Sequence, residues 1–104
     1  MTQYRVWIRD EAKAEVRRLP GHMRQRVRQF VQSLGQEPRP PATRQLRLPE
    51  NFDLEVRRAR MDRYRLIYVV DDDCEEVGVL AVRKRPPYDY GDLSEILFDL
   101  GKGA

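Results

Sequence analysis

The sequence predicts one α+β domain, with an N-terminal strand and a helical hairpin packed on a curved antiparallel sheet, and a short C-terminal helix. Two observations favour this class. Apolar residues first recur at helical spacing in two segments separated by Pro20-Gly21, and later form extended runs joined by short turns. A chain of 104 residues with 40% hydrophobic residues suits a single modest core. Residues 1–104 are therefore read as one domain, of which 91–104 form an acidic helix and tail.

The first half of the chain predicts a strand and two helices. Residues 4–8 (YRVWI) alternate apolar and polar side chains, as a half-buried strand does. Asp10 is a candidate N-cap for the first helix, which Pro20-Gly21 ends. The second helix ends at Gly35, in the usual role of a glycine at a helix C-terminus, before a proline-rich segment. Its apolar stripe comprises Met23, Val27, Phe30, Val31 and Leu34.

The second half predicts the sheet and a last helix. Strands are expected at 43–48, 52–59, 64–70 and 76–82. The last two are almost continuously apolar, as central strands covered on both faces are, and their short turns favour an antiparallel meander. Residues 93–100 carry leucine or isoleucine at i, i+3, i+4 and i+7, which predicts an amphipathic helix with its acidic residues on the other face.

Positive charge is concentrated in the body of the chain. Residues 1–88 hold 19 Lys and Arg against 13 Asp and Glu, whereas the remainder is acidic. Only three of the 20 cationic residues are lysines, and the planar guanidinium of arginine suits bidentate contact with phosphate. An arginine-biased genome produces the same composition, so polyanion binding and a merely solvated surface both stay open.

Other classes of site find little support. His22 is the sole histidine and sits in a turn, so we expect no metal and no cofactor. The acidic residues 71–76 are typical of a hairpin turn rather than a cation site. Cys74 is the only cysteine, no apolar run reaches the roughly 18 residues of a membrane span, and residues 4–8 follow no signal-peptide pattern. These features favour a cytoplasmic protein.

Three segments in order carry a family resemblance: EAKAEVRRLPGHMRQRVRQFVQSLGQEPRPP, LEVRRARMDRYRLIYVV and VLAVRKRPPYDY. Together they resemble the RelE/ParE superfamily of toxins from type II toxin–antitoxin systems, and RYRLIY is the most specific piece. The resemblance implies a RelE-like toxin that inhibits translation by ribosome-dependent cleavage of mRNA. A ParE-like inhibitor of DNA gyrase and an inactive binding module are the alternatives. The implied partners are a cognate antitoxin in a hetero-oligomer and mRNA on the ribosome, with contacts to 16S rRNA and no membrane.

The resemblance also implies site residues. Arg65 matches the family's mid-strand arginine, Arg85 the basic group ending the last strand, and Tyr88 or Tyr90 a late tyrosine. These four are the expected catalytic residues, although the tyrosines could instead pack or cap the final helix. Tyr64 and Tyr68, on the strand face opposite Arg65, are expected in the core. The expected RNA-binding residues are Arg57, Arg58, Arg60, Arg83 and Lys84. A charged hairpin at the first three and a solvated strand end at the last two are the alternatives.

One departure concerns the strand that precedes RYRLIY. RelE-type relatives carry lysines at its exposed positions, which we read here as Asp53 and Glu55. Either the neighbouring arginines supply the missing charge, or the activity is weaker or different. Some relatives carry a glutamate near Glu55, where it could orient an arginine or act as a base.

Two further expectations concern the sheet surface. Arg65 shares a face with Ile67 and Val69, and we predict that this face opens into a basic cleft containing Arg65 and Arg85. The C-terminal helix is expected either to be a permanent part of the core or to dock reversibly, with an amphipathic antitoxin segment competing for its groove. The residues expected to take part in antitoxin binding are Leu93, Ile96, Leu97 and Leu100.

Overall fold

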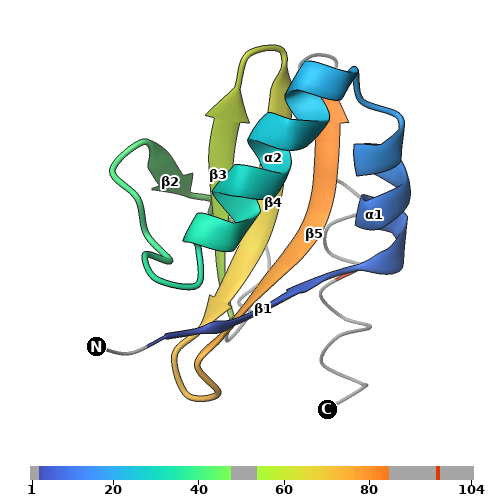
Figure 1. The fold of residues 1–104 in the computed structure, drawn as a ribbon. Helices are drawn as coiled ribbons and strands as arrows, with labels where there is room; N and C mark the ends of the chain where they lie inside the picture. Colours follow the sequence, from blue (N-terminus) through green and yellow to red (C-terminus); the bar gives the residue numbers. More distant parts are fainter. Residues whose placement is uncertain (1–2, 48–53, 85–95, 97–104) are drawn as a thin grey trace.

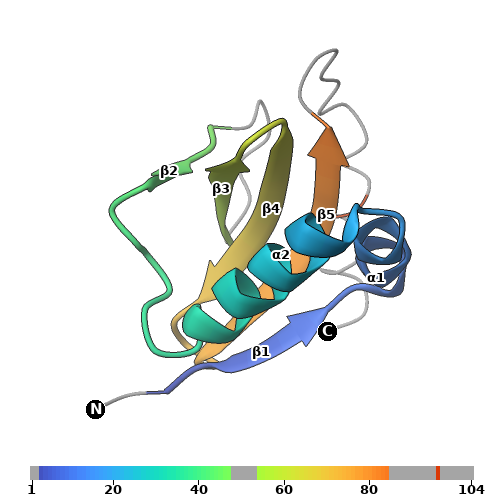
Figure 2. The same ribbon diagram turned by 45° about the horizontal axis from the view of Figure 1, so that its top comes forward.

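The structure, a computed structural model, describes residues 3–47, 54–84 and Ile96 (Figure 1). Within these ranges two helices lie against one face of a five-stranded sheet (Figure 2). In chain order the elements are β1 (Arg5–Ile8), α1 (Asp10–Arg17), α2 (Gly21–Ser33), β2 (Thr43–Gln45), β3 (Glu55–Met61), β4 (Tyr64–Asp71) and β5 (Glu76–Lys84). The predicted α+β class is confirmed, and of the residues predicted to form a C-terminal helix the structure describes only Ile96.

The sheet has the strand order β1-β5-β4-β3-β2 and is mixed. Strands β2 to β5 form the predicted antiparallel meander. The first strand differs from the prediction of an antiparallel sheet, because β1 runs parallel to β5. After β1 the chain crosses one face as α1 and α2, enters the sheet at its far edge and meanders back, so β5 reaches β1 in the same direction.

The helix ends depart from two predictions. Asp10 is the first residue of α1 rather than its N-cap, which is Arg9 and makes no side-chain capping bond. Asp10 and Glu11 still place negative charge near the helix N-terminus, where the helix dipole favours it. Gly35 does not adopt a positive φ after α2. Its carbonyl accepts a 2.7 Å hydrogen bond from the Tyr4 N–H, and a Cβ there would lie 3.1 Å from the Tyr4 carbonyl oxygen.

The core lies on both sides of the sheet. The larger cluster fills the space between the two helices and the sheet, and Tyr68, Leu66 and Val79 within it have no exposed surface. A smaller cluster covers the opposite face and includes Ile67, Leu80 and Ile96. Strands β4 and β5 are therefore buried on both faces, as their continuous apolar runs predicted. No helix among the described residues is long and apolar enough to span a membrane.

The pairing of β1 with β5 depends on a glycine. Gly78 pairs with Trp7, and a Cβ added to Gly78 would lie 2.0 Å from Cζ2 of the indole ring. Because Trp7 packs against the smaller cluster, Gly78→Ala forces the ring out of its contacts. We expect this change to lower the free energy of unfolding by about 1–3 kcal/mol, measured by urea denaturation.

Gly21→Ala is the matched control. The nearest atom to a Cβ at Gly21 is 3.6 Å away, and alanine suits a helix better than glycine. The control should leave stability unchanged or raise it. Equal stability of the Gly78→Ala protein and the wild type would show that the indole moves aside at no cost.

Candidate nucleic-acid interface

The arginine face, defined here as the sheet face that bears Arg58, Arg60, Arg65 and Arg83, lies opposite the two helices. Across it Arg60 of β3 pairs with Arg65 of β4, and Arg65 pairs with Arg83 of β5. Directly paired residues project from the same face of a sheet, so three guanidinium side chains from three strands stand side by side. Arg65 is only 6% exposed, whereas Arg60 is exposed and Arg83 is intermediate.

Arg58 and Arg44 extend this charge toward the edge of the sheet. Arg58 pairs with Ile67, which lies in the cluster on the arginine face. Arg44 of β2 pairs with Arg58 and therefore projects from the same face. Arg44 was not among the residues expected to bind RNA. Its position depends on the pairing of β2 with β3, and a segment of three residues shows no alternation from which to infer that pairing.

The other expected RNA-binding residues do not all join this face. Arg57 pairs with Tyr68 and so projects toward the helices, where its Nη1 lies 2.9 Å from Glu55 Oε2. Its Nη2 also donates to the Thr43 hydroxyl at 2.9 Å. Lys84 pairs with Tyr64, again on the helix side, and is exposed at the end of β5. Arg57 and Lys84 are thus separated by the sheet from Arg58, Arg60, Arg65 and Arg83.

The strand register also explains why β3 carries the acidic residue Glu55 where RelE-type relatives were expected to carry a lysine. Glu55 pairs with Val70 and lies on the helix side, so it does not occupy the face that carries Arg65. On the arginine face the same strand presents Arg58 and Arg60. The sequence reading placed Asp53 and Glu55 where the relatives carry lysines. Glu55 lies on the helix side and not on the arginine face, so that reading was wrong for Glu55. Asp53 lies outside the described residues. Positive charge, not negative, accompanies Arg65 on β3.

Glu55 of β3 links the sheet to the connection between α2 and β2, residues 34–42. Arg39 in that connection donates to Glu55 Oε1 at 2.9 Å and to Asp72 Oδ2 at 2.8 Å. Hydrogen bonds from Arg39, and to a smaller extent from Arg57, lower the pKa of the Glu55 carboxyl, although partial burial opposes this effect. Glu55 therefore stays ionised at neutral pH and is held by two guanidinium groups. It holds Arg39 and Arg57 on the helix side of the sheet, away from Arg65, and its lowered pKa makes it a poor base.

This network predicts loss of stability in acid. A carboxyl whose pKa is lower in the folded state than in the unfolded state, here below 4.5, stabilises the fold above the unfolded value. That contribution disappears as the pH falls through the folded pKa. We expect Glu55→Gln to lower the free energy of unfolding at pH 7 by roughly 0.5–1 kcal/mol, because the pair is partly exposed to solvent. The difference between the variant and the wild type should shrink as the pH falls below 4.5.

Glu37→Gln provides the control, because Glu37 lies in the same connection, is exposed and has no ion pair among the described residues. Its stability should follow the wild type at pH 7 and at lower pH in urea denaturation. A constant difference between Glu55→Gln and the wild type from pH 7 to pH 3 would contradict the role of Glu55 ionisation.

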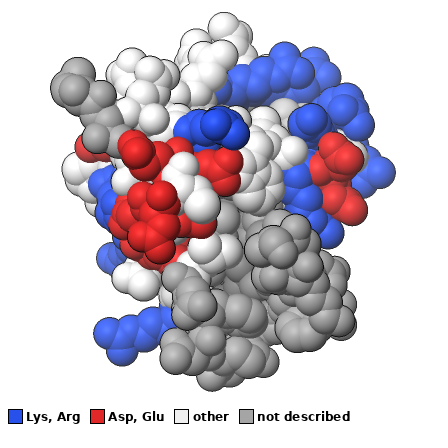
Figure 3. All heavy atoms as spheres, turned by 90° about the horizontal axis from the view of Figure 1, so that it is seen from below, with Lys and Arg blue, Asp and Glu red and all other residues white. Residues whose placement is uncertain are grey.

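The acidic residues 71–76 form the turn between β4 and β5, as predicted. They gather in one patch at the end of the molecule shown in Figure 3. Asp72 accepts a hydrogen bond from the Tyr4 hydroxyl, which together with Arg39 lowers the pKa of the Asp72 carboxyl. Among the described residues no group of three or more His, Cys, Asp or Glu side chains is arranged to hold a metal ion. The hydrogen bonds of Asp72 with Tyr4 and Arg39 therefore hold the turn in place.

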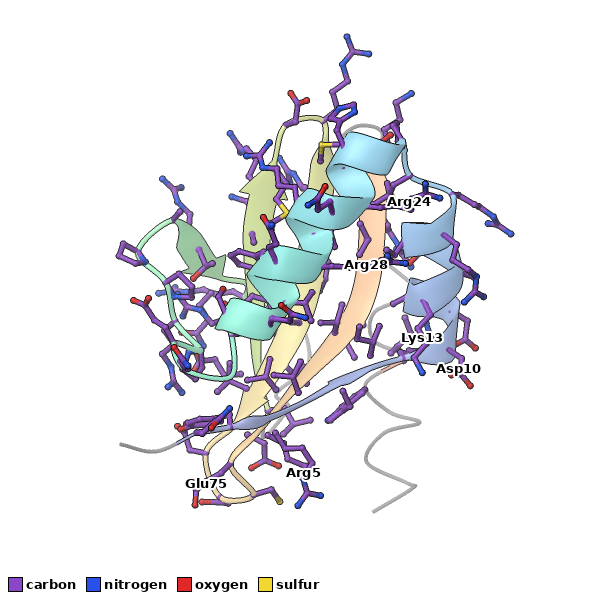
Figure 4. The ribbon with its side chains drawn as sticks, viewed as in Figure 1. Arg5, Asp10, Lys13, Arg24, Arg28 and Glu75 are labelled. Carbon is purple, nitrogen blue, oxygen red and sulfur yellow. The ribbon has the colours of Figure 1, made fainter. Side chains whose placement is uncertain are left out.

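A groove lies between the two helices and the sheet edge. It encloses about 370 Å³ and is lined by apolar side chains such as Ile8, Val16 and Val31. Lys13 of α1 and Arg28 of α2 stand at its rim, and Figure 4 shows them on facing sides of the gap. Its apolar floor and cationic rim suit contact with an amphipathic acidic segment of another protein.

Several predicted site residues lie outside the described residues: Arg85, Tyr88, Tyr90, Leu93, Leu97 and Leu100. The prediction that Arg65 and Arg85 share a cleft therefore stays a prediction. Ile96 is the described member of the predicted antitoxin-binding set. It is 6% exposed and packs with Ile67 and Val69 on the arginine face.

Comparison with known proteins places these features in a family. The family model described as ParE toxin of the type II toxin–antitoxin system parDE matches residues 6–86. No curated protein sequence matches the chain. Among solved structures, the archaeal RelE–RelB complex from Pyrococcus horikoshii OT3 contains a chain 30% identical, with a TM-score of 0.72, covering 85% of this chain and 100% of that one.

Two further structures show the same similarity. The toxin–antitoxin complex RelBE2 from Mycobacterium tuberculosis contains a chain 28% identical, with a TM-score of 0.67, covering 80% of this chain and 99% of that one. The intact RelBE complex of E. coli gives 27% identity and a TM-score of 0.58, covering 78% and 95%. Together with the family match, which spans most of the chain, these similarities show that the chain belongs to the RelE/ParE family of toxins of type II toxin–antitoxin systems.

Proposed function

We propose that this toxin inhibits translation by cutting mRNA on the ribosome, and that the arginine face contacts the RNA. The observation that supports the proposal is the row formed by Arg60, Arg65 and Arg83 across three strands. Arg83 also lies 3.9 Å from Glu15 Oε2 of α1. Guanidinium groups from three neighbouring strands can bind phosphate oxygens bidentately, which favours a polyanion as the ligand of this face.

Metal-independent cleavage of RNA proceeds by attack of the 2′-hydroxyl on the adjacent phosphorus. The step needs a proton acceptor at the 2′-oxygen, positive charge near the non-bridging oxygens, and a proton donor for the departing 5′-oxygen. Arginine stays protonated at neutral pH, so the row suits stabilisation of the charge that develops in the transition state. We propose Tyr88 or Tyr90 as the acceptor, because Arg83, Lys84 and Arg85 precede them closely and nearby cations favour the phenolate. The phenol formed when it takes the proton of the 2′-hydroxyl can then donate that proton to the departing 5′-oxygen.

Arg65 differs from its neighbours in burial. At 6% exposure its guanidinium presents little surface to a ligand, whereas Arg60 is exposed and Arg83 is intermediate. We infer that Arg60 and Arg83 contact phosphate oxygens while Arg65 supplies charge from between them at short range. A positive charge in a partly desolvated position acts more strongly than one in water.

Transcript mapping tests the proposal. The chain is expressed from an inducible promoter, and the new 5′ ends of cellular messages are sequenced. Cuts should appear within translated reading frames, phased to codons, and should disappear when the start codon of a reporter message is removed. Growth arrest without such phased cuts would rule out the ribonuclease function.

Inhibition of DNA gyrase is the second candidate, because the matching family model is that of a ParE toxin. A gyrase inhibitor should change the topoisomer distribution of a plasmid in the same cells before growth stops. Altered supercoiling without phased cuts would favour this candidate. Binding to a partner without either effect would indicate an inactive binding module.

We also propose that a cognate antitoxin neutralises the chain. The similar structures from P. horikoshii, M. tuberculosis and E. coli are complexes of toxin with antitoxin. The helix groove with its cationic rim offers an apolar surface for such a partner, and the sheet face that holds Ile96 offers another. Leu93, Leu97 and Leu100 are proposed to take part with Ile96. Co-purification with the product of an adjacent small reading frame tests the pairing.

A further inference from the structure

A basic basin opens at the edge of the arginine face, beside the row of three arginines. It has a volume of about 320 Å³ and is lined by Ala42, Arg44, Arg58 and Arg60. Three of its four lining residues are therefore arginines, and the fourth has a small side chain that leaves space between them. The arginines come from two strands, so their relative positions depend on the pairing of β2 with β3.

The strand register sets the position of the basin relative to the row. Arg44 pairs with Arg58, and Arg60 follows two residues later along β3 on the same face. Arg60 also pairs with Arg65, so this residue belongs both to the basin and to the row. Neighbouring strands lie about 4.8 Å apart, which places Arg44 on the order of 10 Å from the strand of Arg65. Each strand of a stacked helix carries one phosphate per roughly 3.4 Å of helix axis, so the two positions span a few nucleotides.

The ion pairs of the structure distinguish two arginines of the basin from the arginines on the helix side. Among the residues that the structure describes, Arg44 and Arg58 form no ion pair, whereas Arg39 and Arg57 on the helix side are both paired with Glu55. Arg44 and Arg58 also stand directly opposite each other, an arrangement that is unfavourable between like charges. Guanidinium groups in this arrangement can hold a phosphate bidentately.

We propose that Arg44, Arg58 and Arg60 form a second phosphate site, which binds the backbone of single-stranded RNA a few nucleotides from the phosphate at the Arg65 row. This inference rests on the proposed RNA-cutting function and adds a site on β2 to it. Phosphate contacts position a nucleic acid without reading its sequence. The basin therefore sets where the strand lies across the sheet, and Arg44 is a positioning residue rather than a catalytic one.

Binding to an uncleavable RNA tests the site. The probe is a fluorescent single-stranded 2′-O-methyl RNA, which lacks the 2′-hydroxyl nucleophile, titrated with the full chain at several salt concentrations. Arg44→Gln should weaken binding roughly tenfold at low salt, as expected for loss of a charged hydrogen bond. The slope of log affinity against log salt concentration should fall by about one. Arg44 is exposed, so the variant should keep the thermal unfolding midpoint of the wild type.

Arg26→Gln is the matched control, because Arg26 is an exposed arginine on α2, which covers the other side of the sheet. It removes the same charge and should change affinity less than twofold, with the salt slope unchanged. Equal effects of Arg44→Gln and Arg26→Gln would overturn the site, since only net charge would then matter. An equal loss of affinity for duplex DNA of the same length would overturn the assignment to single-stranded RNA.

The outcome is separable from that of the proposed function. If messages are cut in cells but Arg44→Gln binds the probe as tightly as the wild type, the basin is refuted and the ribonuclease function stands. If Arg44→Gln weakens RNA binding but no cuts occur in cells, the site stands and the ribonuclease function fails. Where cutting occurs, Arg44→Gln should raise KM for ribosome-bound message and leave kcat within twofold.

Discussion

In the proposed ribonuclease reaction, replacing Arg65 with methionine is expected to lower the rate of mRNA cleavage on translating ribosomes by roughly 10²–10³-fold, the usual effect of removing one preorganised group that stabilises transition-state charge. Arg65 is 6% exposed and lies between Arg60 and Arg83. Methionine keeps much of the volume of the buried stem but carries no charge. Single-turnover cleavage of a defined message in a reconstituted translation system measures the rate, and urea denaturation measures stability.

The two measurements separate chemistry from folding. Replacing a buried charge by an apolar side chain of similar size often leaves stability unchanged or raises it. We therefore expect the free energy of unfolding of Arg65→Met to change by no more than about 1–2 kcal/mol. Arg26→Met, on the exposed side of α2, should alter neither quantity. A folded Arg65→Met toxin that cuts at the wild-type rate would show that Arg65 has only a structural role.

Replacing Tyr68 with alanine is expected to lower the free energy of unfolding by about 3–5 kcal/mol, which is a large part of the stability of a small domain. Tyr68 has no exposed surface and lies in the cluster between the helices and the sheet. Its hydroxyl donates a 2.8 Å hydrogen bond to the Pro38 carbonyl and so holds the connection after α2 against the sheet. The change leaves a cavity and breaks this bond. Thermal and urea denaturation both measure the loss.

Tyr68→Phe divides the effect into its parts. It keeps the ring and removes only the hydroxyl, so we expect a loss of about 0.5–1.5 kcal/mol. Tyr64→Ala serves as a second comparison, because Tyr64 is on the same strand face but only partly buried; its loss should be smaller than that of Tyr68→Ala. If Tyr68→Phe were as damaging as Tyr68→Ala, the hydrogen bond rather than packing would dominate.

Much of the fold could be predicted because it depends on local patterns. The period-two alternation in residues 64–70 correctly separated Tyr64 and Tyr68 from Arg65, and the structure places the two sets on opposite faces. The order of helices and strands also followed from turn residues and apolar spacing. The direction of β1 beside β5 could not be predicted, because no local pattern states which distant strand a given strand will pair with.

The candidate site was predictable only in part. Arg65, Arg58, Arg60 and Arg83 were expected at an RNA-binding surface and share one face. Arg57 differs from Arg58 by a single position, which is enough to turn its side chain to the helices. Arg44 was missed because β2 is short, and its sequence does not reveal that it pairs with β3 and so places Arg44 opposite Arg58. Glu55 was placed among the exposed positions of the site because its partner Arg39 lies far away in the sequence.

The sequence by itself determined most of the helices and strands, their order and the two-sided burial of β4 and β5. These properties depend on backbone propensity and on short apolar periods, which act over a few residues. Tertiary structure alone decided the register. Register placed Arg60, Arg65 and Arg83 in one row, set Arg44 against Arg58, and laid Trp7 over Gly78. It is decided by packing and pairing between distant segments, where a shift of one residue would turn every side chain to the other face.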